Sequence, residues 1–139
     1  MVAASGSEPI SVVEIDIYGP PAPIISIQVP DSIDLGNISY NGDGTRTRVD
    51  INNSGNVNVN IKPVLVDSGD QIFSNLYFIR RTTDVYTKIG TWSINVNASS
   101  SGVEQEYFYM KLDLRDFNGN IVSDMLNERE NIKFIATQA

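Results

Sequence analysis

Residues 48–61 read RVDINNSGNVNVNI, and apolar and polar residues alternate on both sides of a break centred on Gly55. One face of each half carries only Thr, Val or Ile: Thr47, Val49 and Ile51 before the break, and Val57, Val59 and Ile61 after it. Such alternation is typical of half-buried antiparallel strands, because successive side chains of a strand point to opposite faces. Short polar residues and glycine favour a turn at the break. We therefore predict two adjacent strands joined by a tight polar turn, with the asparagines at turn or solvent-facing positions.

The same period of two recurs along the chain. Further apolar faces of this kind are Val13/Ile15/Ile17, Ile25/Ile27/Val29, Ile33/Leu35, Trp92/Ile94/Val96, Phe108/Met110/Leu112/Leu114 and Ile132/Phe134/Ala136. Turn sequences rich in Gly, Asn and Asp separate these segments, and only Ile121–Asn131 has room for a helical turn. This spacing predicts an all-β sandwich or barrel with Trp92 in the core. Pro63 interrupts its strand, so we predict it at an edge or a bulge.

The composition excludes several kinds of chemistry. The chain has 139 residues, 41% of them hydrophobic, which is typical of one globular domain, and it contains neither Cys nor His. Nucleophile systems and zinc or haem sites built on those two residues are therefore excluded. Glu104 and Glu106 form the best local carboxylate pair, but at i and i+2 on a strand, beside Tyr107, they are more typical of an exposed strand face than of a catalytic dyad. We predict no catalytic residues and no cofactor.

A calcium loop is the remaining metal hypothesis. Asp116, Asn118 and Asn120 fit the first three ligand positions of an EF-hand, but Ile121 stands where glycine is required and Asn127 where glutamate is required. Asp113 and Asp124 would add ligands only to a looser loop site. A plain turn is the simpler interpretation, and we predict no metal site.

The net charge of −7 is concentrated near the N-terminus. Residues 1–44 contain six carboxylates and no Lys or Arg, whereas residues 45–139 contain eleven acids and ten bases. Since nucleic-acid binding needs clustered cations, we expect no nucleic-acid partner. No apolar run is long enough to span a bilayer, and MVAASGSEPI lacks the features of a signal peptide. We expect Met1 to have been added to a mature or truncated chain, in which case any export signal or membrane anchor lies upstream.

Two segments carry a resemblance. SIDLGNI (residues 32–38) and GTRTRVDINNSGNVNVNI (residues 44–61) resemble the opening strands of immunoglobulin-like domains common on archaeal and bacterial surfaces, over about residues 24–66. The resemblance implies an immunoglobulin-like antiparallel β-sandwich of seven to nine strands over residues 24–139. It also implies a non-catalytic extracellular or cell-surface role, as a surface-layer, pilus, thread or adhesion component. The antibody-type cysteine pair is missing and Trp92 lies too late for the strand-C tryptophan, so the general sandwich is implied.

Residues 1–23 form a separate N-terminal strand and spacer. Ile10–Tyr18 (ISVVEIDIY) has a complete strand pattern, and Gly19–Pro23 (GPPAP) predicts a stiff extended segment. Three interpretations are open. The strand folds back as an edge strand of its own sandwich, it pairs through Val13, Ile15 and Ile17 with the sheet edge of another subunit, or it is a tether to an upstream anchor. The expected partners are accordingly other copies of the chain or a surface-layer protein.

Two further functional classes are considered. One is a soluble surface-layer-docking domain of an archaeal motility or pilus complex. The other is a carbohydrate-binding module, in which Tyr107 and Tyr109 on the outward face of one strand stack on sugars, although packing of these rings under a loop is the simpler interpretation. Finally, three triplets match the N-glycosylation pattern and are expected to be used only if the chain is secreted: Asn37, Asn52 and Asn97.

Overall fold

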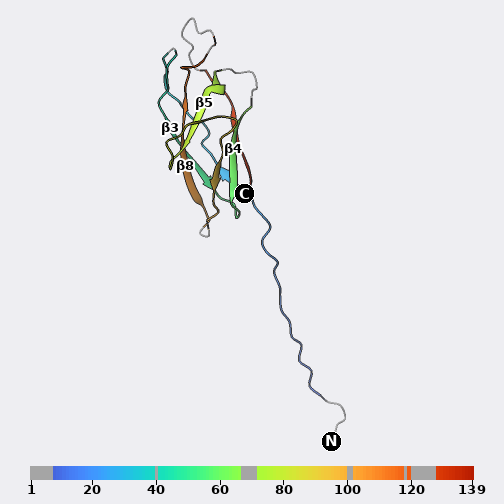
Figure 1. The fold of residues 1–139 in the computed structure, drawn as a ribbon. Helices are drawn as coiled ribbons and strands as arrows, with labels where there is room; N and C mark the ends of the chain where they lie inside the picture. The colour runs from blue at the N-terminus through green and yellow to red at the C-terminus, as the bar shows by residue number, and fades with distance from the viewer. Residues whose placement is uncertain (1–7, 40, 67–71, 100–101, 118, 120–127) are drawn as a thin grey trace.

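The computed structural model describes residues 8–39, 41–66, 72–99, 102–117, 119 and 128–139. Within these ranges the chain forms a five-stranded and a three-stranded antiparallel sheet and one short 3-10 helix, η1 (Phe73–Asn75). The five-stranded sheet has the order β2 (Ile27–Gln28), β3 (Thr47–Asn53), β8 (Glu104–Leu112), β5 (Leu76–Arg80) and β6 (Thr87–Lys88). The three-stranded sheet has the order β7 (Ile94–Val96), β4 (Val59–Leu65) and β9 (Ile132–Gln138). The predicted all-β class is confirmed, and the two packed sheets have the architecture of a β-sandwich (Figure 1).

The core lies between the two sheets and is centred on aromatic rings. Trp92 stacks on Phe78 with ring centroids 4.8 Å apart, and its ring lies 4.9 Å from that of Phe108. The apolar faces predicted for Trp92–Val96 and for Phe108–Leu114 are buried, as the period of two requires. Burial of these large rings supplies much of the apolar area removed from water.

The segment between β3 and β4 is an arch between the sheets, so the prediction of two adjacent paired strands is wrong. β3 pairs with β2 and β8, whereas β4 pairs with β7 and β9. Both strands do bury their predicted apolar faces: Val49, Ile51, Val59 and Ile61. An arch and a hairpin present the same alternation to the core, which is why periodicity did not distinguish them.

Asn53 closes this arch from the inside. Its side chain is fully buried, although we predicted turn or solvent-facing positions for the asparagines. Asn53 Nδ2 donates to the carbonyl oxygens of Val57 (2.9 Å) and Val96 (3.2 Å), and Asn53 Oδ1 accepts the N–H of Gly55 (2.9 Å). One amide therefore ties the end of β3 to the turn and to β7 of the opposite sheet.

Pro63 lies buried inside β4, the central strand of its sheet, and not at the predicted edge or bulge. β7 pairs only with Val59–Ile61, and β9 pairs with Val59–Leu65. Along β4 the backbone groups of odd-numbered residues point to β7, because even-numbered Asn58 and Val66 hydrogen bond to the chain of β9. Pro63 therefore lacks an N–H on the side of β4 that faces β7. Because β7 ends before this position, no strand there requires a hydrogen-bond donor from residue 63.

Residues 8–23 leave the sandwich as an extended thread (Figure 1). They form no strand, and the first paired residues of the chain are Ile27–Gln28. The structure therefore does not have Ile10–Tyr18 folded back as an edge strand of its own sandwich. Of the segment considered for a helical turn, residues 121–127 lie outside the described residues, and 128–131 are not helical.

We predict that Asn53→Ala lowers the free energy of unfolding by about 3 kcal/mol, since it leaves buried backbone groups without partners. The matched control is Asn52→Ala on the half-buried neighbour, whose amide makes a single 3.4 Å contact with Gln28 Oε1. Urea unfolding followed by the fluorescence of Trp92, the single tryptophan, measures both. Equal effects of the two substitutions would show that the arch does not depend on the buried amide.

Candidate functional site

The N-terminal thread is fixed to the sandwich at the arch. Asn56 Oδ1 accepts the N–H of Ile24 (2.6 Å), Asn56 Nδ2 donates to the carbonyl of Ala22 (3.0 Å), and the Asn56 N–H donates to the carbonyl of Ile24 (3.1 Å). The hydroxyls of Ser26 and Ser54 add a 2.8 Å contact. These bonds define where the thread leaves the sandwich, and nothing in the sequence pattern indicated them.

Gly55 makes this attachment possible. A Cβ atom at this position would overlap the carbonyl oxygen of Ile24. The Gly55 N–H also donates to the carbonyl of Ser26 (3.2 Å). Glycine is therefore required here by the close approach of the thread, not by its backbone angles.

The thread has the alternating pattern of a strand but pairs with no strand of the described chain. Val13, Ile15 and Ile17 are 89%, 78% and 84% exposed and form a face with no charge. The opposite face carries the carboxylates of Glu14 and Asp16. No hydrogen bond joins Ile10–Tyr18 to the rest of the described chain. A continuous apolar row of this kind, left in water, is characteristic of an interaction segment.

β9 presents a second unpaired element. The N–H of Ala139 donates to Asn58, and the N–H of Val66 donates to the carbonyl of Asn131, both at 2.9 Å. In an antiparallel ladder hydrogen-bonded and non-hydrogen-bonded pairs alternate, so the odd-numbered residues of β9 bond to β4. The even-numbered Ile132, Phe134 and Ala136 direct their N–H and C=O groups to the other side, where no strand of the described chain pairs.

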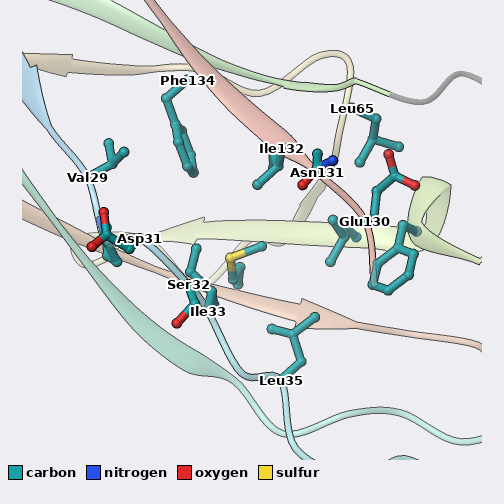
Figure 2. Close-up of a pocket in the computed structure, with 14 residues that line it drawn as sticks. Val29, Asp31, Ser32, Ile33, Leu35, Leu65, Glu130, Asn131, Ile132 and Phe134 are labelled. Atoms are coloured by element: carbon teal, nitrogen blue, oxygen red, sulfur yellow. The ribbon is translucent and has the colours of Figure 1, made fainter. Parts of the chain in front are cut away.

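A groove of about 160 Å³ opens beside this edge. Figure 2 shows Ile132 and Phe134 on one wall and Ser32, Ile33 and Leu35 on the other. The ring of Phe134 lies 6.1 Å from the ring of Phe108, so the groove leads directly to the core. The unpaired edge of β9 is therefore bordered by partly covered apolar surface.

The tyrosines proposed for sugar stacking carry arginines on their faces. The guanidinium of Arg48 lies 3.8 Å from the ring centre of Tyr107, and that of Arg46 lies 4.4 Å from the ring centre of Tyr109. The two rings are also nearly perpendicular, at 82°. This geometry is a cation–π ladder on the outer face of the five-stranded sheet, not a flat open platform.

Two of the carboxylates considered for catalysis or metal binding, Glu106 and Asp113, form ion pairs with arginines. Glu106 forms an ion pair with Arg81, and this hydrogen bond raises the pKa of the Arg81 guanidinium. Asp113 accepts from Arg115 Nε (3.0 Å) and from a terminal nitrogen of Arg115 (2.7 Å), which lowers the pKa of the Asp113 carboxyl. The described residues contain no group of three or more potential metal ligands.

The other predicted positions are scattered over the surface. Of the calcium-loop residues, Asp116 is exposed, and Asn118, Asn120 and Asp124 lie outside the described residues. Asn37 and Asn97 are exposed in loops, whereas Asn52 is half-buried in β3. None of these is brought next to the thread or the groove by an interaction that the structure shows.

No helix among the described residues is long and apolar enough to cross a bilayer. No protein-family model, curated protein or solved structure matches this chain. The thread and the edge of β9 are therefore interpreted from their geometry.

The Asp113–Arg115 pair generates a pH prediction. Because the folded pKa of Asp113 is lowered, its stabilising contribution is present above the ordinary value near 3.8 and is lost as the pH falls through the folded pKa. We expect Asp113→Asn to lower the thermal midpoint at pH 6 and to have a progressively smaller effect as the pH falls below 3.8. Asp84→Asn removes the same charge from an exposed position without an ion pair and serves as the control. A pH-independent effect of Asp113→Asn would contradict the assignment.

Proposed function

We propose that this protein is a non-catalytic structural subunit that assembles by donating Ile10–Tyr18 to the sheet edge of another copy. The observation that carries the proposal is the strand pattern of Val13, Ile15 and Ile17 held almost fully exposed outside the sandwich. Burying each of these side chains contributes about 1.5–3 kcal/mol. Strand addition buries them and pairs the backbone of the segment at the same time.

The spacer favours pairing in trans. Every residue of Gly19–Pro23 is either a proline or is followed by one, and both conditions favour extended backbone. The end of this spacer is hydrogen bonded to Asn56 at the arch. A fold-back of Ile10–Tyr18 onto its own sandwich would require a tight reversal inside this segment, which the prolines oppose.

The strand order supports an immunoglobulin-like type. Immunoglobulin sandwiches place strands A-B-E-D in one sheet and C-F-G in the other. β2-β3-β8-β5 corresponds to the first order, and β4-β9 to C-F, with β6 and β7 as additions. We propose an extracellular or cell-surface location on the resemblance of residues 32–61 to surface domains of archaea and bacteria.

A docking domain is the second candidate, because an extended thread fixed at one point also suits a tether. In that case the residues of the thread act through length and stiffness, not through their apolar face. At about 3.3 Å per residue, residues 8–23 reach roughly 50 Å. The two candidates therefore differ in whether the identity of Ile15 matters.

We expect Ile15→Asp to weaken self-association at least about tenfold, because one buried isoleucine contributes more than the roughly 1.4 kcal/mol of a tenfold change. Val12→Asp adds the same charge to the opposite face and should change association less than about twofold. Light scattering after size exclusion over a wide concentration range, with negative-stain microscopy, measures both. Deleting residues 1–21 should abolish assembly while Trp92 fluorescence still reports a folded sandwich. Assembly that is insensitive to Ile15→Asp, or a wild-type monomer at all concentrations, would favour the tether.

A further inference from the structure

We infer that the acceptor for the donated strand is the unpaired edge of β9 together with its bordering groove, in a second copy of the chain. This inference rests on the proposed strand donation and names the surface that receives the strand. The geometry points to it through hydrogen bonding, apolar complementarity, charge and topology.

The first argument is hydrogen bonding. Ile132, Phe134 and Ala136 direct their backbone N–H and C=O groups away from β4, and no strand of the described chain pairs with these groups. An unpaired edge is a template for another strand. Across the described residues β9 is the longest strand at the edge of either sheet, since β2 and β6 have two residues each and β7 has three.

The second argument is the match of side-chain faces. On β9 the inward positions are Ile132, Phe134 and Ala136, all partly buried against the core. On the donor the uncharged positions are Val13, Ile15 and Ile17. Two strands in one sheet point alternate residues to the same face, so the three donor side chains would fall over the groove between β9 and residues 32–35.

The third argument is charge. Asp31 and Glu130 also line the groove, so a donor strand with carboxylates facing the groove would be repelled. When Val13, Ile15 and Ile17 turn inward, Glu14 and Asp16 turn to the outer face of the three-stranded sheet. The exposed side chains on that face include the cations Lys62 and Lys133. The carboxylates of the donor thus meet opposite charge on the outer face and are kept away from Asp31 and Glu130 in the groove.

The fourth argument is topology. With β4 and β9 in the positions of strands C and F, no strand of the described residues lies beside β9 in the position of strand G. A strand from another copy at this place completes the sheet. Each copy then donates one strand and accepts one, a head-to-tail arrangement that closes into a ring or extends as a filament.

Two complementary variants test the inference. Ala136→Pro removes an N–H from the unpaired edge and keeps the bonds of β9 to β4, whereas Ala136→Ser keeps the N–H and is the matched control. Ile15→Asp disables the donor and leaves the acceptor intact. We expect each of Ala136→Pro and Ile15→Asp to be monomeric alone, and an equimolar mixture to give a dimer and nothing larger, because only one donor and one acceptor remain.

The outcomes separate the acceptor from the proposed function. If Ala136→Pro assembles like Ala136→Ser while Ile15→Asp does not, strand donation stands and the acceptor is wrong. If Ile15→Asp assembles normally, the proposed function itself fails.

A second measurement does not depend on the folding of Ala136→Pro. Carbodiimide treatment of wild-type assemblies made from isotopically distinct copies should join Glu14 or Asp16 to Lys133 between copies. Inter-copy links from those carboxylates only to Lys88 or Lys111, on the other sheet, would overturn the assignment.

Discussion

The fully buried amide of Asn53 is the interaction on which the rest of this structure depends. This amide hydrogen bonds to backbone groups of the arch and of β7 at the same time. These bonds stabilise the crossing of the chain from one sheet to the other after β3. Gly55 and Asn56, two and three residues further along the chain, contact the last residues before the sandwich. A buried polar group is stable only when all of its hydrogen-bond partners are in place. The geometry of the arch therefore specifies both where the chain crosses between the sheets and where the thread leaves the sandwich.

The chain contains two exposed elements that are individually unfavourable. Val13, Ile15 and Ile17 place apolar surface in water, and no strand of the described residues pairs with the outer edge of β9. Natural sheets usually protect such an edge with charge, a bulge or a short strand. Here the edge strand is seven residues long and Phe134 links its groove to the aromatic core. The two elements are complementary in length, apolarity and charge, which is the basis of the proposed assembly.

The charged and aromatic side chains on the outer face of the five-stranded sheet largely interact with one another. Arg46 and Arg48 cover the faces of Tyr109 and Tyr107, and Glu106 and Asp113 are paired with arginines. Exposed pairs of this kind add little to stability, but they keep rings and carboxylates from offering open binding surface. The strand alternation that placed the tyrosines outward says nothing about what lies over them.

The sequence by itself determined the all-β class and the core faces around Trp92 and Phe108, because alternation acts locally. It left open whether Ile10–Tyr18 folds back onto its own sandwich. It did not determine that β3 and β4 lie in different sheets, that Asn53 is buried, or that Pro63 sits in a central strand. Those facts depend on which strands pair, and strands with the same period can pair in many ways. The edge of β9 and its groove were likewise decided only by the tertiary structure, since an edge is defined by which strands of the described residues lie beside it.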